Sequence, residues 1–307
     1  MNYIFFFPQL IAGPILRPGQ LINQLQEKIN INFNNFHLGM FIFSIGIFKK
    51  IYIADTIGQI IDPTFINIAN SSNIDLLNAF LLFPFQIYYD FSGYTDMAIG
   101  LALVLNISLP ENFNMPYLTR SIREFWQKWH ITLSNWIRDY IYIPLGGSEK
   151  SSYLTLVNII LAMSLSGLWH GASYNFLIWG FFNGIFIALE RIFERFIKLK
   201  SIYRITINLF IVFNLWVLFR CQSLLDAIIM YKKIYSLDTI VQLGNNIIVF
   251  LVVIFMIFLH KYDQRDYYKK IGNIKYSYIV MPIWIIVILL GLMLSQGSSD
   301  KFIYFDF

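Results

Sequence analysis

The sequence has a single cysteine, Cys221, and few charged residues, and each shortage excludes a class of protein. One cysteine excludes an internal disulfide and a metal site built from several cysteines, so we expect no bound metal ion. Charged residues make up 13% of the chain, against roughly 25% in a soluble globular domain. So few charges cannot cover a water-exposed surface. This excludes a soluble enzyme, a disordered chain and a protein whose partner is a nucleic acid.

The signature motifs of four common protein classes are also absent. The sequence contains no G-x-x-x-x-G-K-[ST], no G-x-G-x-x-G, no H-E-x-x-H and no G-x-S-x-G. An ATP-driven pump, a Rossmann dehydrogenase, a zinc protease of the zincin type and an α/β-hydrolase are therefore unsupported.

The residues that are present predict a membrane protein. Hydrophobic residues make up 57% of the chain and aromatic residues 18%, and the net charge is +5. The basic residues lie in short clusters between apolar stretches, a pattern that sets membrane topology. We therefore expect an all-α, polytopic helix bundle in the lipid bilayer, with re-entrant and interfacial helices. No soluble domain, linker or internal repeat is visible, so residues 1–307 are expected to form one transmembrane domain.

The apolar stretches predict where the chain crosses the bilayer. Spans are expected at 38–61, 153–168, 173–190, 205–219, 241–260 and 277–295. The tract 76–109 is expected to form two segments, because polar residues around Gly93 interrupt it. Lys49 and Lys50 are interpreted as an internal or snorkelling basic pair within the first span.

Three segments do not have the composition of a simple span. Residues 4–16 are apolar but contain Pro8 and Pro14, which predicts a re-entrant or interfacial segment. Residues 17–35 are polar and are expected to form a loop. Residues 111–150 combine charge with aromatic side chains, which favours helices that lie at the interface or dip partly into the bilayer.

Two basic loops set the expected topology. Residues 191–204 and 261–276 are rich in Lys and Arg, and two predicted spans separate them, so both loops lie on one side. The positive-inside rule makes that side cytoplasmic, which predicts a multi-pass protein of the inner, or cytoplasmic, membrane. The C-terminal tail is then expected outside.

Among the four histidines, His170 has the most unusual context, because it lies between two spans with no charged residue nearby. A neutral imidazole at such depth is suited to accept a proton near pH 7. The alternative is a histidine that only hydrogen-bonds a neighbouring helix, and the residues alone leave both open. Gly167 and Gly171 predict close helix contact, and they would also let a ligand approach the ring. His37 and His260 are interpreted as interfacial polar residues.

The other candidates favour a structural interpretation when judged from the residues alone. If one helix carries both Trp126 and His130, they are neighbours four residues apart, and an amphipathic interfacial helix with tryptophan anchors is the favoured interpretation. Asp90 and Asp96 are expected to bond backbone groups freed at a break near Gly93. The alternative makes one of these carboxylates the orienter of a histidine.

Eight segments together resemble the membrane-bound O-acyltransferase (MBOAT) family. The nearest likeness is its bacterial branch with the alginate O-acetyltransferase membrane subunit, the peptidoglycan O-acetylating membrane protein and the teichoic-acid D-alanylation protein. In family order, the segments are FFPQLIAGPI (6–15), YDFSGYTDMA (89–98), PENF (110–113), EFWQKWH (124–130), WIRDYIYIPLGG (136–147), GLWHG (167–171), WVLFR (216–220) and FIYF (302–305). They cover essentially the whole chain.

The resemblance implies an acyl transfer to a hydroxyl inside a membrane-embedded tunnel. His170 matches the family's catalytic histidine, and as a general base it would take the hydroxyl proton. His130 matches the second histidine, which would orient a substrate or stabilise developing charge. The residues expected to bind substrate are Trp129, Trp169, Asp90, Asp96 and Arg138.

The resemblance also implies the donor and the partners. The donor is expected to be acetyl-CoA or another acyl thioester, used as a substrate, with no bound cofactor. Arg120, Arg123, Lys128 and Arg138 would meet its phosphates, although solvated interfacial anchoring is the other interpretation of these residues. A periplasmic or extracellular SGNH-type partner is expected to place the acetyl group on a polysaccharide, either an alginate-like exopolysaccharide or a cell-wall glycan.

Two alternatives from other classes stay open. Family members carry further helices before the F-P-Q motif, which starts here within ten residues of Met1. The alternative is therefore a truncated, catalytically silent membrane scaffold of a polysaccharide-secretion complex. Intramembrane Asp90 and Asp96 also suggest a transporter, although the lack of repeat symmetry counts against it.

Overall fold

The computed structural model describes residues 13–27, 32–193, 199–273 and 277–295, together with Phe6, Pro8 and Lys275. Within this part of the chain the structure is helical and contains no strand. Five of its helices are long and apolar enough to cross a membrane, and six if one bent pair counts as a span. The predicted fold class, a polytopic membrane helix bundle, is confirmed.

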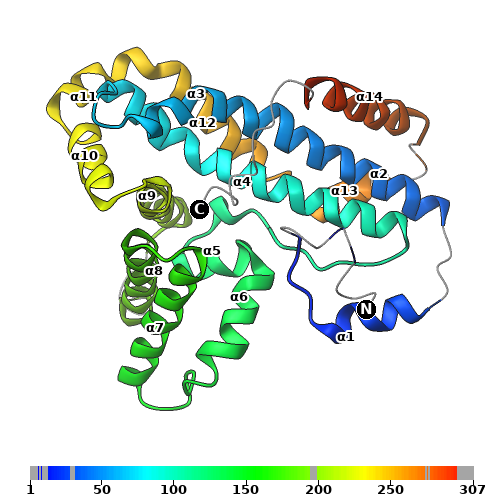
Figure 1. Cartoon of the computed structure of the whole chain (residues 1–307), viewed down its shortest axis with the longest axis horizontal. Helices are drawn as coiled ribbons and strands as arrows, with labels where there is room; N and C mark the ends of the chain where they lie inside the picture. The colour runs from blue at the N-terminus through cyan, green and yellow to red at the C-terminus, as the bar shows by residue number, and fades with distance from the viewer. Residues whose placement is uncertain are drawn as a thin grey trace.

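The upper layer in Figure 1 is built around two long helical stretches that pack along each other. The first comprises α2 (Phe33–Ile47), the π-helix η2 (Phe48–Ala54) and α3 (Asp55–Ile66). The second is α4 (Asn73–Val104). Helix α14 (Ser277–Ser295) packs against α2, and α12 (Ile247–His260) packs against α4. The predicted spans 38–61 and 277–295 correspond to the first stretch and to α14.

The lower part of Figure 1 holds α7 (Ser152–His170) and α8 (Tyr174–Phe193), with α9 (Ser201–Arg220) between them and the upper layer. These three helices confirm the predicted spans at 153–168, 173–190 and 205–219. Two shorter helices, α10 (Leu224–Ile234) and α11 (Leu237–Gln242), lead back to α12. The helix found at the predicted span 241–260 is shorter than predicted, because α12 begins only at Ile247.

Helix α4 is unbroken, so the two segments predicted for 76–109 are wrong. A Cβ atom at Gly93 would lie 2.8 Å from the carbonyl oxygen of Gly46, and one at Gly100 would lie 2.5 Å from that of Gly39. Both distances are shorter than any van der Waals contact. The glycines therefore let α2 and α4 approach each other closely, and Gly93 does not end a helix.

Glycines also bring α7 and α8 together, as predicted from their spacing. A Cβ atom at Gly167 would lie 2.2 Å from the Phe176 carbonyl oxygen, and one at Gly180 would lie 2.3 Å from that of Met163. At Gly171 an added Cβ would meet the Phe176 ring at 2.6 Å. The expectation that these glycines leave room for a ligand beside His170 is therefore wrong, because helix α8 fills that space.

One of the irregular segments, 17–35, differs from expectation, and most of another lies outside the described residues. Within the predicted loop 17–35, α1 (Pro18–Gln26) is a helix that starts with proline at its first position. Leu21 anchors it with no exposed surface. Of the predicted re-entrant segment 4–16, only Phe6, Pro8 and residues 13–16 belong to the described part, and they are not in a long helix.

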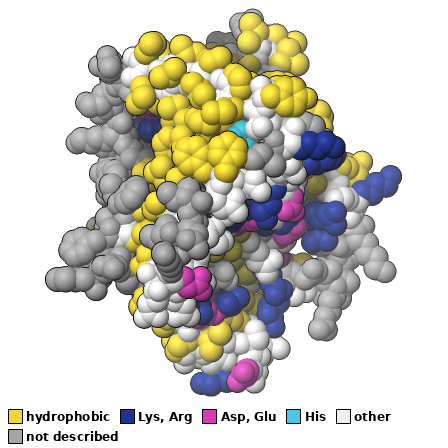
Figure 2. Space-filling model, turned by 90° about the vertical axis from the view of Figure 1, so that its right-hand side faces the viewer, with side chains coloured by type: hydrophobic (Ala, Val, Ile, Leu, Met, Phe, Trp, Pro, Cys, Tyr) yellow, Lys and Arg dark blue, Asp and Glu magenta, His cyan; other side chains and the backbone are white. Residues whose placement is uncertain are grey.

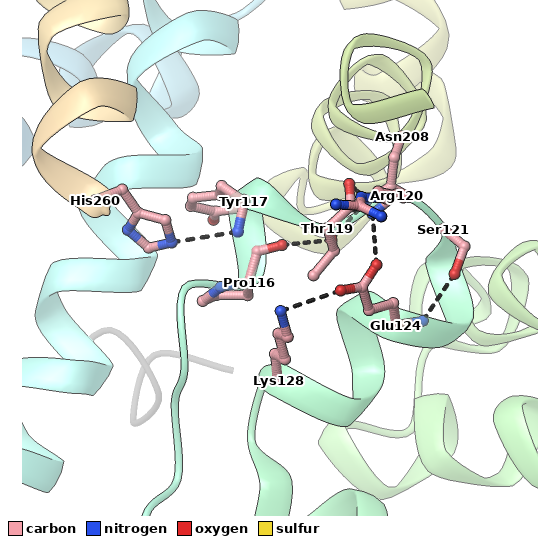
Figure 3. A network of polar contacts seen from close by, with 9 residues as sticks. All are labelled: Pro116, Tyr117, Thr119, Arg120, Ser121, Glu124, Lys128, Asn208 and His260. Carbon is pink, nitrogen blue, oxygen red and sulfur yellow. Dashed lines mark hydrogen bonds and ion pairs between the residues drawn. The ribbon is translucent and has the colours of Figure 1, made fainter. Parts of the chain in front are cut away.

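The expectation that the two basic loops share one side of the membrane stays a prediction, and one segment of the described chain bears on it. Segment 116–120 touches helix ends next to both loops (Figure 3). Tyr117 N donates to His260 Nε2 at the end of α12 (3.2 Å). Asn208 near the start of α9 donates to the Thr119 carbonyl oxygen (3.2 Å). Residues 261–276 are not simply a loop, since they include α13 (Arg265–Ile271), bent by 74° from α12. Residues 194–198 and the C-terminal tail lie outside the described residues.

Hydrophobic side chains cover much of the molecule's outer surface. Figure 2 shows them over most of the upper part of one face, with charged side chains gathered mainly in its lower part. Exposed apolar residues of α14 include Ile283, Leu290 and Leu294. Such a surface suits contact with lipid tails.

Candidate active site

His130 lies at a break between two short helices. Helix α5 (Ile122–Lys128) ends before it, and α6 (Ile131–Ile137) begins directly after it. His130 itself has a φ of 43°, in the left-handed region that side chains other than glycine rarely adopt. The predicted pairing of Trp126 and His130 on one helix is therefore wrong, because the helix ends between them.

Asn112 fixes this break from the preceding loop. Its carbonyl oxygen accepts a hydrogen bond from Ile131 N (2.9 Å). Its side-chain Oδ1 accepts from Thr132 N (3.2 Å) and from Thr132 Oγ1 (2.8 Å). The same Oδ1 lies 3.2 Å from His130 Nδ1. Four contacts from one residue thus hold the strained backbone and the imidazole together.

These contacts also fix which ring nitrogen of His130 carries hydrogen. The backbone N–H of Thr132 can only donate, so the atom of Asn112 facing it is the carbonyl oxygen. That oxygen can only accept, so His130 Nδ1 is the donor in their contact. Burial first, and then the neighbouring imidazole of His170, hold the pKa of His130 well below its usual value. The neutral ring therefore keeps a lone pair on Nε2.

His170 is the last residue of α7 and is half-buried. Its ring contacts Phe219 (5.3 Å between centroids) and Trp179 (5.4 Å), both edge to face. Gly171, which follows it, packs against Phe176. The end of α9 and the start of α8 thus hold the ring from two sides.

Buried tryptophans connect the two histidines. Trp129, next to His130, packs on Trp216 (4.9 Å), which stacks on Trp179 (6.0 Å). Trp129 is 1% exposed and Trp126 8%, so the predicted tryptophan anchors at the lipid interface are wrong for these two residues. The structure brings together three of the predicted site residues, His130, His170 and Trp129.

Among the other predicted site residues, Trp169 adjoins His170 and the two aspartates lie in ion pairs of the upper layer. Trp169 is 54% exposed, although its ring touches that of His170 (5.0 Å). Lys50 Nζ lies 2.7 Å from Asp90 Oδ1, and Lys49 Nζ lies 2.6 Å from Asp96 Oδ2. Because α4 continues past both carboxylates, the expectation that they bond backbone groups at a break is wrong. Their roles in substrate binding stay predictions.

A cavity of about 690 Å³ opens between α5, α6, α7, α8 and α9, within the range of roughly 300–1,000 Å³ typical of ligand sites. Five arginines line it: Arg120, Arg123, Arg138, Arg191 and Arg204. Its wall includes Ser166, one turn before His170, and Trp126, which contacts Trp179 (5.5 Å). The cavity therefore approaches the tryptophan cluster from a basic mouth, and Arg138 belongs to that mouth.

Sequence reasoning missed several residues of the site. Asn112 is part of the PENF segment, yet nothing in its neighbours indicates a contact with His130. Arg191 and Arg204 were assigned to topology alone. His260 was interpreted as interfacial but has no exposed surface, and His37 is buried against Trp284. No cluster of three or more metal-binding side chains occurs among the described residues.

Comparison with known families decides which family the chain belongs to. The family model described as "MBOAT, membrane-bound O-acyltransferase family" matches residues 1–227. The chain belongs to the membrane-bound O-acyltransferase family. Membership confirms the resemblance drawn from the sequence motifs, and residues 228–307, which include His260, lie beyond the matched part.

Curated relatives come from the branches that the motifs indicated. The chain is 42% identical to the peptidoglycan O-acetyltransferase of Helicobacter pylori over 246 residues, which cover 77% of this chain and 46% of the relative. It is 35% identical to the "Probable alginate O-acetylase AlgI" of Pseudomonas putida over 341 residues, 99% of this chain and 68% of the relative. It is 29% identical to the teichoic acid D-alanyltransferase of Bacillus subtilis over 215 residues, which cover 64% of this chain and 52% of the relative. The chain spans about half the length of most of these relatives.

Proposed function

We propose that this MBOAT protein is a membrane-bound O-acetyltransferase that moves an acetyl group from a thioester donor to hydroxyls of a polysaccharide. The names of its relatives support the reaction type, since they are an O-acetyltransferase, an O-acetylase and a D-alanyltransferase. The observation that carries the proposal is the placement of His130 and His170 at one tryptophan cluster, beside a cavity with a basic mouth.

In this mechanism His170 acts as the general base. Its imidazole accepts the proton of an acceptor hydroxyl while the hydroxyl oxygen bonds to the carbonyl carbon of the thioester. The C–S bond then breaks, and the departing thiolate takes the proton from His170. No covalent bond to the protein forms. His130 orients a substrate or stabilises the developing charge, since Asn112 holds its ring in one position.

The arginine-lined cavity is the proposed donor site, with acetyl-CoA as the donor. The phosphates of coenzyme A are multiply charged, and guanidinium groups bind phosphate oxygens in pairs. The lining of the cavity includes Arg191 and Arg204 and also Ser166, one turn before His170, so we orient the acetyl end of a bound donor towards His170. We place this mouth on the cytoplasmic side of the inner membrane, because Arg191 and Arg204 of the first basic loop line the cavity.

The acceptor is proposed to be an exopolysaccharide such as alginate, or a cell-wall glycan, reached through an SGNH-type partner. The silent scaffold has less support than the enzyme, because the matched relatives are named as transferases. A transporter gains no support from the aspartates, whose ion pairs with Lys49 and Lys50 stabilise them within the helical layer.

A labelled-donor assay tests the function. Membranes that contain the protein, its SGNH-type partner and the acceptor polysaccharide are incubated with radiolabelled acetyl-CoA, and acetylated polysaccharide is counted. His170→Ala is expected to lose transfer by a factor of about 100 or more. His37→Gln is the matched control, since it removes a buried imidazole of α2 and keeps an acceptor for Trp284. Equal transfer by wild type and His170→Ala rejects the assignment.

A further inference from the structure

A second, much smaller cavity lies behind the His130 site. It has a volume of about 30 Å³ and is enclosed by α2 with η2, by α4, by segment 111–113 and by the turn after α12. A cavity needs roughly 10–15 Å³ of such volume to hold one water molecule. The space therefore fits about two water molecules and nothing larger.

Four buried polar atoms come from residues that line this cavity. They are Ser92 Oγ, Thr95 Oγ1, Asn112 Nδ2 and Arg265 Nε, and none has a hydrogen-bond partner among the described residues. Leaving one such group unpaired costs roughly 1–3 kcal/mol. Native proteins satisfy groups of this kind with ordered water, which makes about three hydrogen bonds. The donors and acceptors needed to bind water are thus already in place.

Three charged groups at the cavity, Lys49, Asp96 and Asp263, are paired with one another, and Glu111 and Arg265 are the other charged residues that line it. Lys49 Nζ lies 2.6 Å from Asp96 Oδ2 and 2.5 Å from Asp263 Oδ1. Tyr88 donates its hydroxyl hydrogen to Asp263 (2.6 Å), and Tyr268 donates to it as well. These contacts fix the carboxylates and the ammonium without occupying the cavity.

The amide of Asn112 connects the cavity to His130. Asn112 is 1% exposed. Its Oδ1 faces Thr132 and His130, so its Nδ2, the other branch of the amide, points away from those partners, and Asn112 lines the cavity. A water molecule that accepts from Nδ2 stabilises this orientation against the flipped amide, which would set Nδ2 against the N–H of Thr132. The orientation of the amide in turn determines the tautomer of His130.

His260, the last residue of α12, and Arg265, the first residue of α13, hold the chain on either side of Asn112. Arg265 Nη1 donates to the Leu109 carbonyl oxygen (2.9 Å), just before Asn112. His260 Nε2 accepts from Tyr117 N (3.2 Å), just after it (Figure 3). Arg265, His260 and Asp263 all lie beyond residue 227, outside the part matched by the family model. The C-terminal part of the chain thus encloses the cavity and restrains the segment that carries Asn112.

We propose that this cavity is an internal water site that positions Asn112, and through it the imidazole of His130. Ser92, Thr95 and Asn112 bind the water, while Arg265 and His260 hold the segment around it. These are positioning residues, because none of them touches the reacting atoms in the proposed reaction. The consequence for activity rests on the proposed function, whereas the water site and the tautomer do not.

Histidine ¹⁵N NMR of the full-length protein in lipid nanodiscs tests the proposal without any substrate. Wild type is expected to show His130 as the Nδ1–H tautomer, assigned by its loss in His130→Gln, and a water contact at the Asn112 side-chain amide. Thr95→Val removes one water ligand and should give mixed tautomers, whereas Thr95→Ser keeps the hydroxyl and should restore the wild-type spectrum. Thr155→Val is the matched control, since Thr155 is equally buried and bonds only its own helix.

An Asn112 amide without a water contact, or an unchanged His130 signal in Thr95→Val, overturns the proposal. Transfer kinetics supply the second readout. Thr95→Val should lower kcat by about tenfold to a hundredfold with the KM for the donor unchanged, and Thr95→Ser should recover it. If wild type transfers no acetyl group, the proposed function fails, and the NMR result still decides whether the water site exists.

Discussion

Arg220 and Asp62 form an ion pair of 3.1 Å that joins the end of α9 to α3. The guanidinium also lies over the ring of Phe65, 4.9 Å from its centroid. Phe219, the preceding residue, is the one that packs edge-on against His170. This contact thus helps to fix the wall of His170, the proposed general base.

Asp62→Ala is expected to lower the stability of the protein. It leaves the Arg220 guanidinium, whose side chain is 19% exposed, without its counterion, and we expect a loss of roughly 1–2 kcal/mol. The measurement is thermal unfolding in detergent, followed by tryptophan fluorescence. Asp266→Ala removes an exposed partner 4.0 Å from Lys269 and should stay within about 0.5 kcal/mol of wild type. An equal effect of both substitutions would contradict the anchoring role of Asp62.

Gly93→Ala is expected to push α2 and α4 apart. The new methyl group would meet the Gly46 carbonyl oxygen at 2.8 Å, and backbone cannot yield as a flexible side chain does, so we expect a loss of roughly 1–3 kcal/mol. Gly19→Ala in α1 meets nothing within 4 Å and should be neutral or slightly stabilising. Unfolding in denaturant compares the two variants. A Gly93→Ala protein as stable as Gly19→Ala would show that α2 and α4 do not cross so closely.

Removing arginines from the mouth of the large cavity should weaken donor binding. Arg123→Gln and Arg191→Gln each remove one phosphate-binding group, and each is expected to raise the KM for acetyl-CoA by about tenfold, the equivalent of one charged hydrogen bond. The effect should shrink at high ionic strength. The exposed Lys232 of α10 does not line the cavity, so Lys232→Gln serves as the control. A KM that does not change in either arginine variant would place the donor elsewhere.

Acid should destabilise the protein partly through His130. Its pKa is held below the usual value in the folded state, so the unfolded chain binds the proton more readily. Stability from this group is therefore complete above about pH 6.5 and is lost as the pH falls below that value, by up to about 1.4 kcal/mol per pH unit. Melting temperatures at pH 7.5 and pH 5.5 measure the loss. His130→Gln should show a smaller loss between the two, and an identical slope would count against a neutral, buried His130.

Hydropathy predicts the membrane-crossing helices because burial in lipid acts on each stretch of chain by itself. Helices α7, α8 and α9 lie within a few residues of the predicted spans. The continuity of α4 was not predictable in this way, because Gly93 packs against Gly46, 47 positions earlier, and only the folded structure brings the two together. From its neighbours in sequence alone, Gly93 is interpreted as a break in the helix, whereas the structure shows it at a contact between two helices.

The histidines could be found from the sequence, but their surroundings could not. Composition and motifs indicate His170 and His130. Asn112 holds His130 across a left-handed backbone turn, and no local propensity predicts that conformation for a histidine. Asp263 meets Lys49 across more than 200 positions. Contacts of this range follow from packing, so a single sequence carries no local signal for them.

The hydrogen bonds that His260 and Arg265 make on either side of Asn112 have a practical consequence for shortening the chain. A polypeptide cut after residue 227 keeps both histidines and the arginines of the large cavity. It loses the acceptor for the Tyr117 amide hydrogen and one of the two counterions of Lys49, which leaves Asp96 as the only partner of that buried ammonium among its two ion pairs. The boundary of the family model is therefore not a boundary at which this molecule can be divided.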